Sequence, residues 1–419
     1  MFDNTSANHL CCSEYNAIGD NIDITTYFQP IIALKNKTII GYESLCRGIC
    51  KECGRIIYPY ELFTKITLEK NLFNLDFLAR KSAFADFSKL VEKDKNILLF
   101  LNFDVSLVGK GIETPDMLAD LLEEFNINPQ NIVVEITESK PCDLSVLAKF
   151  MTACKAHGFL IALDDVGTGY SNLDRILTIR PDILKIDRSI ISDINNNYHK
   201  KAVFRTLSRL ARKIGTFILA EGVETEEEVV YCVELGAELL QGFYFTVPKK
   251  IDNNLINEVN DKITYTTNKC NQYKIDRIDK LKEQNQLFDG IITYMAKVLS
   301  EKTFNEINEI ESFLASHIQK YDFVESVYLI DNKGLQITDT ILNHDKCLRR
   351  TLLYKPKQKN DSHSYKDYFY YLQDGPFKKY STDTFISLLT GHLCRTLSLQ
   401  FNDKNNNSHI ICMDIKESK

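Results

Sequence analysis

The chain has 419 residues, which is too long for one ordinary hydrophobic core, and 44% hydrophobic with 26% charged residues describes a folded globular protein. It carries 51 Lys and Arg against 57 Asp and Glu, and this net charge of −6 argues against a protein built to hold a DNA or RNA polymer. The sequence has neither an apolar run of the roughly 20 residues that span a bilayer nor a secretory signal, so its twelve cysteines are expected to be reduced thiols in a cytoplasmic protein.

The first half of the chain is periodic. Residues 1–22 are polar and predict a flexible tail, and from residue 27 to 248 short apolar runs alternate with amphipathic stretches. These stretches predict helices over Asp116–Phe125, Leu144–His157, His199–Ile214 and Glu226–Leu235. Repeated strand–helix units predict a parallel sheet with helices on its faces, and seven or eight such units close into an α/β barrel of the TIM (β/α)₈ type.

Nearly every predicted strand ends at a polar or ionisable residue, and these residues are Glu43, Asn102, Glu135, Asp164, Asp165, Lys185, Glu221 and Gln241. Because a TIM barrel collects its chemistry at the carboxyl ends of the strands, they predict one shared site. Crowded carboxylates need cations, and oxygen ligands without His or Cys favour Mg²⁺ or Mn²⁺ over zinc. Two such cations are a common device for phosphate-ester hydrolysis. The alternative is a set of ordinary turn residues or solvated acids.

The second half of the chain has a different pattern. Residues 251–320 predict a connector and a helix with a short heptad stripe formed by Ile278, Leu281, Asn285, Phe288, Ile292, Met295 and Leu299. This stripe fits either a dimer seam or a helix that lies on its own domain. Residues 321–419 predict a small α+β domain with strands at Val324–Ile330, Leu335–Thr338, Tyr368–Leu372, Arg395–Phe401 and His409–Asp414.

Seven dispersed motifs between about residues 24 and 249 resemble the signatures of EAL domains, which hydrolyse cyclic di-GMP to linear pGpG. In chain order they are Phe28-Gln29-Pro30-Ile31 with Gly41-Tyr42-Glu43-Ser44-Leu45-Cys46-Arg47, Asn102, Glu135-Ile136-Thr137-Glu138, Asp164-Asp165-Val166-Gly167-Thr168-Gly169-Tyr170-Ser171, Lys185-Ile186-Asp187, Glu221-Gly222-Val223-Glu224-Thr225 and Gln241-Gly242-Phe243. The resemblance implies a modified TIM barrel over residues 23–250 and a metal-dependent phosphodiesterase.

The resemblance also implies roles for single residues. The ligands of a first metal ion would be Glu43, Asn102, Glu135 and Asp164, and those of a second would be Asp164, Asp165 and Glu221. Lys185 would orient the attacking water, and Glu221 would be its general base. Arg47 would bind a phosphate, with Gln29, Leu45 and Gln241 also at the substrate. Glu138 would brace the loop Val166–Asn172, which in the family also helps to form a homodimer, and the role of Glu224 is left open.

Three positions depart from the family pattern. Ser44 stands for the eponymous Ala, Val166 follows the Asp pair in place of Phe, and Asn172 replaces the second Ser of the loop. Every metal-binding position is retained, which favours an active enzyme. The alternative is a catalytically weak or inactive EAL domain that binds cyclic di-GMP as an effector.

Two further patterns have competing interpretations. Cys46, Cys50 and Cys53 have the spacing that holds a [4Fe–4S] cluster in radical SAM enzymes, but no SAM-binding signature follows, so reduced thiols are the default. The segment Thr384–Asp414 resembles a PAS- or Cache-like sensory domain. Its stretch Gly391–Thr396 would either line a small-ligand pocket or form a turn into a core strand.

Overall fold

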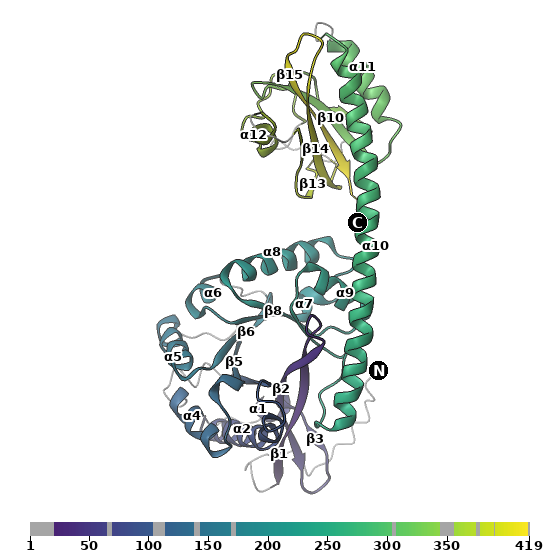
Figure 1. Cartoon of the computed structure of the whole chain (residues 1–419). Coiled ribbons are helices and arrows are strands. Elements are labelled where there is room, and N and C mark those ends of the chain that lie inside the picture. The colour runs from purple at the N-terminus through teal and green to yellow at the C-terminus, as the bar shows by residue number, and fades with distance from the viewer. Residues whose placement is uncertain are drawn as a thin grey trace. The chain divides into compact units, whose positions relative to one another are not determined.

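The computed structural model describes residues 21–64, 69–103, 114–137, 143–168, 173–303, 307–343, 356–373, 378–388 and 390–417. The chain divides into two compact units, one up to Ile275 and one from Asp276 onward (Figure 1). The predicted tail 1–22, apart from its last two residues, lies outside the described residues, as do Glu138 and the end of the loop Val166–Asn172. No helix in the described part of the chain is long and apolar enough to cross a membrane.

The first unit is built on a closed barrel of eight strands. They are β1 (Ile22–Ala33), β2 (Thr38–Cys50), β4 (Leu98–Phe103), β5 (Ile132–Thr137), β6 (Leu160–Val166), β7 (Ile183–Ile186), β8 (Phe217–Glu221) and β9 (Leu239–Gln241). Neighbours run in the order β1-β9-β8-β7-β6-β5-β4-β2, and β2 pairs back with β1 to close the ring. A short strand β3 (Ile56–Ile57) pairs antiparallel with the last part of β2, outside the ring. The predicted α/β barrel is therefore confirmed.

One strand departs from the all-parallel pattern predicted from the repeats. β1 is antiparallel to both of its neighbours, β2 and β9, whereas the strands from β2 through β4 to β9 are parallel to one another. The turn between β1 and β2 comprises only residues 34–37, which is too short for a crossover helix and therefore makes a hairpin. This hairpin is the modification of the TIM barrel.

Helices cover the outer face of the barrel (Figure 1). They are α1 (Pro59–Thr64), α2 (Glu69–Val91), α4 (Pro115–Glu124), α5 (Leu144–His157), α6 (Leu173–Ile179), α7 (Arg188–Ile191), α8 (Tyr198–Ile214) and α9 (Glu226–Leu235), with a 3₁₀ turn η2 at Pro129–Asn131. The four predicted helices are confirmed, because local signals fix their ends. Side-chain oxygens of Asp143 and Asn197 cap α5 and α8, and Gly158 and Gly215 end them with positive φ.

Two apolar layers hold the barrel together. One lies between the sheet and the helices, and the other fills the barrel interior with side chains that include Ile31, Phe100, Val133, Ile183 and Leu219. Each of these interior side chains is at most 3% exposed. Because the interior is packed, polar side chains at the carboxyl ends of the strands sit on an apolar floor.

The long helix α10 (Asn253–Ser300) contributes to the cores of both units. Leu255, Val259 and Ile263 belong to the apolar core of the barrel unit. Near its other end, the last four residues of the predicted heptad stripe, Phe288, Ile292, Met295 and Leu299, are buried in the core of the second unit. This part of the stripe therefore packs on its own domain. The expected limits of the connector, 251 and 320, remain predictions.

The second unit is an α+β domain with an antiparallel sheet, as predicted. Its elements are α11 (Ile307–Ile318), β10 (Val324–Asp331), β11 (Ile341–Leu342), α12 (Asp367–Gln373), β12 (Lys379–Ser381), β13 (Phe385–Ile386), β14 (Leu393–Asn402) and β15 (Ser408–Lys416). The strand order is β11-β10-β15-β14-β12, with β13 also paired to β14.

Two of the strands predicted in this unit are wrong. Leu335–Thr338 forms only isolated bridges, and Tyr368–Leu372 lies in helix α12. The aromatic residues of Tyr368–Leu372 favour a strand by propensity, but Tyr368, Phe369 and Leu372 are the buried ones, at helical spacing. Burial of one helical face against the sheet overrode the local preference.

Candidate active site

The predicted site residues of the barrel meet at the carboxyl ends of the parallel strands. Glu43 pairs with Phe100 at the last register position that β2 shares with β4, and Asn102 is directly opposite Glu135 on the next strand. Asp164 is opposite Thr137, and Glu221 is opposite Gln241. Strand pairing thus places the ends of β2, β4, β5, β6, β8 and β9 around one mouth.

Lys185 on β7 joins three of these carboxylates. Its Nζ lies 2.5 Å from Glu135 Oε1, 2.6 Å from Glu221 Oε1 and 3.2 Å from Asp164 Oδ1. The Lys185 side chain is 1% exposed and that of Glu135 is fully buried. Three acids and one base in this space leave an excess of buried negative charge.

That excess raises the pKa of the lysine and of the acids alike, so it favours the charged lysine and disfavours the charged acids. Burial disfavours the Lys185 ammonium, but the surrounding carboxylates outweigh it and raise the pKa of Lys185 well above its usual range. Burial raises the pKa of Glu135 and of Glu221 well above the usual value, and Lys185 only partly offsets it. An additional cation would stabilise the ionised form of these acids.

A second group of polar side chains lies around Glu43. Asn102 Nδ2 donates to Glu43 Oε1 at 3.0 Å, and Gln241 Nε2 donates to Glu43 Oε2 at 2.5 Å. Gln241 Nε2 also lies 3.2 Å from Gln29 Oε1, and Gln29 itself donates to the Thr246 carbonyl at 3.2 Å. Hydrogen bonds from two strands, β4 and β9, therefore fix the position of the Glu43 carboxylate, and Gln29 on β1 contacts the Gln241 that makes one of them.

Of the positions that depart from the family pattern, Ser44 lies on β2 and Val166 on β6 beside Asp165, and Asn172 lies outside the described residues. Asp165 has a φ of 58°. Its N–H donates to Asp164 Oδ1 at 2.9 Å, so the two adjacent acids point differently. The Ser44 hydroxyl donates to the Phe100 carbonyl at 3.1 Å, while Val166 is 1% exposed in the apolar core. Neither substitution displaces a predicted ligand.

The donor set fits a hard divalent cation. In the described part of the chain, no three Asp, Glu, His or Cys side chains meet at metal-ligand spacing, because three carboxylates meet at the Lys185 ammonium instead. Yet the buried Glu135 Oε2 and Gln241 Oε1 have no hydrogen-bond partner among the described residues. A cation would satisfy buried oxygens that lack a hydrogen-bond donor. All the candidate metal-ligating atoms are oxygen atoms.

Arg47 lies farther along β2 and is only 7% exposed. Its guanidinium carbon is 5.4 Å from the centre of the Tyr27 ring and 5.2 Å from that of Tyr58. One guanidinium nitrogen donates to the Cys46 carbonyl at 2.8 Å, and burial lowers the pKa of Arg47. Two aromatic rings therefore hold a buried cation on the strand that carries Glu43 and the half-buried Leu45.

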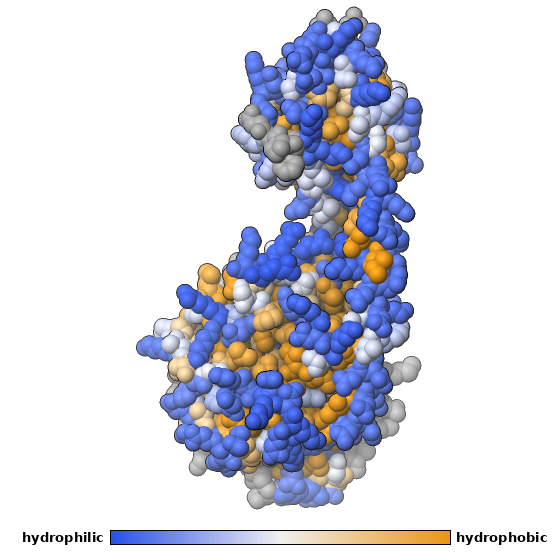
Figure 2. Space-filling view, viewed as in Figure 1, coloured by the Kyte–Doolittle hydropathy of each residue, from blue (hydrophilic) through white to orange (hydrophobic). Residues whose placement is uncertain are grey.

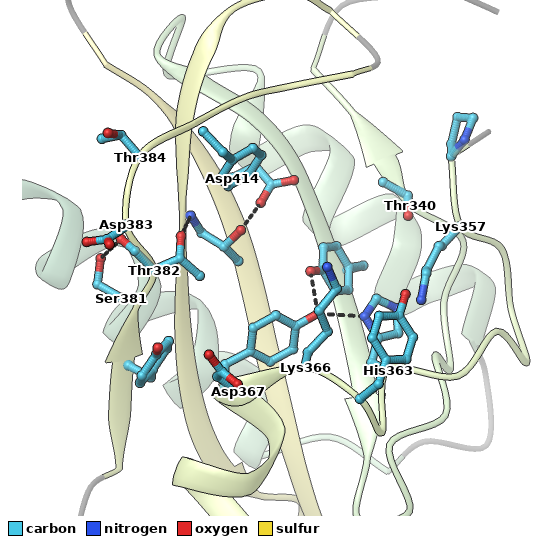
Figure 3. Close-up of a pocket in the computed structure, with 17 residues that line it drawn as sticks. Thr340, Lys357, His363, Lys366, Asp367, Ser381, Thr382, Asp383, Thr384 and Asp414 are labelled. Carbon is cyan, nitrogen blue, oxygen red and sulfur yellow. Dashed lines mark hydrogen bonds between the residues drawn. The ribbon is translucent and has the colours of Figure 1, made fainter. Parts of the chain in front are cut away.

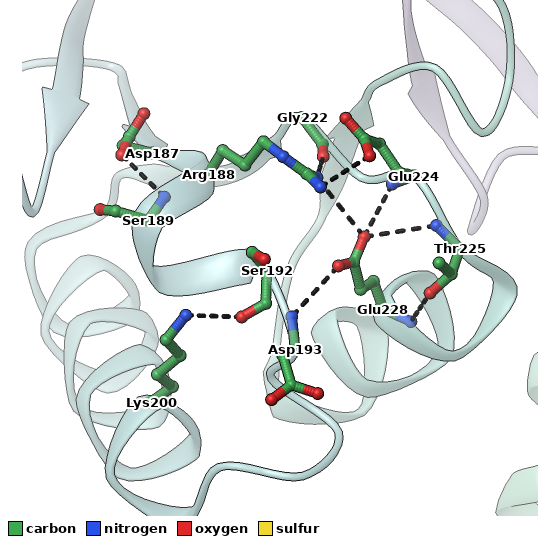
Figure 4. A network of polar contacts seen from close by, with 10 residues as sticks. All are labelled: Asp187, Arg188, Ser189, Ser192, Asp193, Lys200, Gly222, Glu224, Thr225 and Glu228. Carbon is green, nitrogen blue, oxygen red and sulfur yellow. Dashed lines mark hydrogen bonds and ion pairs between the residues drawn. The ribbon is translucent and has the colours of Figure 1, made fainter. Parts of the chain in front are cut away.

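Glu224 does not join the carboxylate cluster. Its side chain is exposed and pairs with Arg188 at 2.7 Å, in a network that also contains Glu228 (Figure 4). Arg188 also donates to the Gly222 carbonyl. The network therefore clamps the residues that directly follow Glu221.

Glu228 is the centre of this network, and the sequence analysis missed it. Its carboxylate accepts from the backbone N–H groups of Asp193, Glu224 and Thr225, at 3.2, 2.7 and 3.3 Å. Asp193 follows β7, which carries Lys185, and the other two follow β8 (Figure 4). The signal was present as a capping box, Thr225 followed three residues later by Glu228.

Replacing Glu228 by Ala is expected to lower the free energy of unfolding of the barrel unit by about 1–3 kcal/mol, because three partly buried hydrogen bonds to backbone N–H groups lose their acceptor. Chemical denaturation followed by circular dichroism measures the change. Glu227→Ala, on an exposed neighbour in the same helical turn, is the matched control and should change stability by at most about 0.5 kcal/mol. Equal stability of the two variants would contradict the role of Glu228.

The three cysteines with cluster-like spacing are distributed along β2 and the turn after it. Cys50 is buried in a small apolar cluster, Cys46 is half-buried beside it, and Cys53 is exposed. Burial raises the pKa of Cys46 to about 12, which disfavours a metal-binding thiolate. Nothing in the described geometry favours an iron–sulfur site at these positions.

A closed barrel with carboxylates, amides and a buried lysine gathered at the carboxyl ends of its strands defines an α/β-barrel enzyme. Residues 15–248, more than half of the chain, match the EAL domain family. The chain belongs to this family, which confirms the resemblance read from the seven motifs.

The relatives extend this result. The EAL-domain containing protein YkuI of Bacillus subtilis is 25% identical over 91% of this chain and 92% of its own. The crystal structure of YkuI in complex with c-di-GMP and calcium has a TM-score of 0.78 at 23% identity, covering 95% of this chain and 97% of that one, so the two-unit fold is shared.

The cyclic di-GMP phosphodiesterase RocR of Pseudomonas aeruginosa is 30% identical over 55% of this chain and 58% of its own length. A structure of the EAL enzyme Bd1971, in a form bound to cAMP and cyclic di-GMP, has a TM-score of 0.51 at 28% identity and covers 55% of this chain and 64% of that one. The chain thus spans about three fifths of the length of these two proteins.

Proposed function

We propose that the protein is a metal-dependent phosphodiesterase that hydrolyses cyclic di-GMP to linear pGpG. The observation that carries this proposal is the convergence of Glu135, Asp164 and Glu221 on Lys185 at the mouth of an EAL barrel. Relatives with the same family domain carry the name of cyclic di-GMP phosphodiesterase. Oxygen donors around a strongly negative pocket suit the hydrolysis of a phosphate ester.

The cation would be Mg²⁺ or Mn²⁺, with two ions in each site. Glu43, Asn102, Glu135 and Asp164 would hold the first, and Asp164, Asp165 and Glu221 the second. The bound cations would supply charge neutralisation for the phosphodiester and lower the pKa of a water molecule.

The protein side chains would divide the remaining work. Lys185 balances part of the carboxylate charge and directs Glu135, Asp164 and Glu221 toward one point. Glu221 would accept the proton of the attacking water. Gln241, together with Gln29, holds Glu43 in position.

Arg47 would bind a phosphate of the substrate, with Leu45 beside it on β2. Its fork of N–H donors matches two phosphate oxygens, whereas a lysine offers a single point charge. Arg47→Lys is therefore expected to raise KM on the order of tenfold with a smaller change in kcat, measured from initial rates of pGpG formation. A fall in kcat at unchanged KM would contradict a role in substrate binding.

The proposal is tested by incubating the full-length protein with cyclic di-GMP and either Mg²⁺ or Mn²⁺, and by following pGpG by chromatography. Formation of pGpG that stops on addition of a chelator and resumes with the metal supports the proposal. Absence of pGpG with every divalent cation would reject it.

A second candidate function is binding of cyclic di-GMP without turnover. The observation that favours it is Val166, which ends β6 next to Asp165 in place of the family Phe and is enclosed in the core. Calorimetry that shows tight binding by a protein without hydrolytic activity would select this function. Restoration of turnover by Val166→Phe would assign the defect to this position.

A homodimer is the proposed assembly. The middle of α10 carries exposed apolar side chains (Figure 2), and Ile275 and Ile278, 54% and 42% exposed, are three residues apart on one face of the helix. Light scattering on the purified protein measures its mass, and a monomer at micromolar concentration would contradict this proposal. The cytoplasmic location and the absence of a nucleic-acid polymer as partner stay predictions.

A further inference from the structure

The C-terminal domain contains a cavity of about 680 Å³ that the proposed phosphodiesterase reaction does not use (Figure 3). Its lining comes from the face of the sheet that bears Tyr328 on β10, Thr396 on β14 and Asp414 on β15, together with α12 and the segment 380–385. The volume is within the range of sites for small molecules. Of the stretch Gly391–Thr396 that the sequence singled out, only Thr396 lines it.

The sheet has two faces of different character. Val327, Leu397 and Met413 face the apolar core with α10 and α11. On the opposite face, Ser326, Asp414 and Thr396 lie side by side on three adjacent strands, because Asp414 is in register with both of the others. A carboxylate in the middle of a sheet face is costly unless something compensates it.

Asp414 has two hydrogen-bond donors but no cation. Ser326 Oγ donates to one carboxylate oxygen at 2.7 Å and Thr396 Oγ1 to the other at 2.6 Å. Within 4.0 Å, no Lys, Arg or His in the described part of the chain pairs with this carboxylate. Each oxygen can still accept another hydrogen bond on the side of the cavity. Burial raises the pKa of Asp414, and the hydrogen bonds from Thr396 and Ser326 and the charge of Lys366 offset this rise only in part.

His363, which also lines the cavity, does not supply a positive charge for Asp414. Gln336 Nε2 donates to the Thr338 carbonyl, so its Oε1 is the atom that faces His363 Nε2, at 2.8 Å. His363 Nε2 therefore carries the proton, and Nδ1 accepts from the Tyr368 hydroxyl at 2.6 Å. Burial lowers the pKa of His363 to about 4, so the ring is neutral near pH 7. The Tyr328 hydroxyl lies 3.1 Å from the Tyr368 hydroxyl and is the last member of this series of uncharged hydrogen-bonded groups at the cavity.

The two lysines that line the cavity, Lys357 and Lys366, lie beside Tyr365 at its exposed rim. Lys357 Nζ is 4.5 Å and Lys366 Nζ is 5.3 Å from the centre of the Tyr365 ring, and Lys357 also donates to the Ser362 carbonyl at 2.6 Å. In Figure 3 the labelled Lys357 and His363 lie at one side of the cavity, and Ser381, Thr382 and Asp383 at the other, with Asp414 nearer to the latter group. The floor and the far wall therefore present acceptors and carboxylates.

We propose that this cavity binds a small molecule that carries an ammonium group, with Asp414 as its counter-ion and the tyrosine rings of the lining around it. The ammonium group would donate to the free acceptor positions of Asp414, and Tyr328 and Tyr380 line the same space. Two classes of ligand carry such an ammonium group, namely amino acids and simple amines. Amino acids would also place a carboxylate toward Lys366 at the rim, whereas alkyl amines and polyamines would not.

The test is isothermal titration calorimetry of the full-length protein against the twenty amino acids, putrescine and spermidine, with succinate and acetate as probes without an amine. We expect heat of binding from at least one amine-bearing probe and none from the two acids. Asp414→Asn keeps the shape of the side chain and one of its two acceptor oxygens, and it should weaken that binding on the order of a hundredfold. Asp322→Asn, at an exposed position of the same domain, should leave it unchanged.

Lys366→Met distinguishes the two sources, because it should weaken the binding of an amino acid and not that of a diamine. Binding that Asp414→Asn does not change would overturn the proposal, as would binding of succinate or acetate alone. Absence of heat from every amine-bearing probe at millimolar concentration would also overturn it. Circular dichroism of Asp414→Asn checks that the domain is folded. None of these measurements depends on phosphodiesterase activity.

Discussion

Glu43→Gln will lower the turnover of cyclic di-GMP by about a thousandfold or more. Neutralising one proposed metal ligand removes several kcal/mol of transition-state stabilisation, and about 4 kcal/mol corresponds to this factor. The glutamine keeps one oxygen to accept from Asn102 or Gln241, which hold the carboxylate at 3.0 and 2.5 Å, so the fold should persist. Formation of pGpG under saturating Mn²⁺ is the measurement.

The control for this variant is Glu52→Gln, at an exposed position in the turn that follows the same strand. It removes the same charge from the protein and should leave kcat within about twofold, because it lies outside the carboxylate cluster. Normal turnover by Glu43→Gln would show that the carboxylate cluster is not the catalytic site. An unfolded variant would be recognised by circular dichroism, and Glu221→Gln would then carry the test.

Lys185→Met is expected to have the second large effect, a loss of unfolding free energy. This variant tests the role of Lys185 in stability separately from its role in turnover. Removing the ammonium leaves Glu135, Asp164 and Glu221 without the cation that lies 2.5 to 3.2 Å from their oxygens. Breaking a buried ion pair in this way is expected to cost about 3–5 kcal/mol of unfolding free energy in the presence of a chelator. Urea denaturation at fixed pH measures the loss.

Divalent cations should restore part of the stability lost in Lys185→Met, since they compensate the same carboxylates, while turnover stays low. Lys213→Met, on the exposed face of α8, serves as the control and should change neither quantity. A Lys185→Met protein as stable as the wild type in chelator would mean that the three acids are protonated there and need no counter-ion.

The sequence was sufficient to predict most of the candidate site, because a parallel barrel brings the ends of its strands together whatever the intervening helices are. Glu43, Asn102, Glu135, Lys185 and Gln241 each follow or end an apolar run, and pairing of adjacent strands fixes their neighbours. Local capping signals likewise placed the ends of α5 and α8, at Gly158 and Gly215. The helix ends depend on short-range sequence, and the site depends on the regular repeat of strands and helices.

Features that depend on tertiary packing were not predictable in the same way. The aromatic residues of Tyr368–Leu372 favour a strand locally, and only the sheet beneath them selects the helix α12. The hydrogen bond from the N–H of Asp193 to Glu228 joins two segments that the sequence does not show as neighbours. Asp414 follows a run of five buried residues in β15, and the cavity beside it is formed by segments distant in the chain.

Helix α10 has a practical consequence for dissecting the protein. A barrel expressed only to residue 250 would lose Leu255, Val259 and Ile263 and expose the apolar surface that they cover, so poor solubility of such a fragment would say nothing about its catalytic competence. The two compact units meet in sequence between Ile275 and Asp276. A fragment boundary, or a fusion that exchanges one unit for that of another protein, belongs at this junction, where each core keeps its own part of the helix.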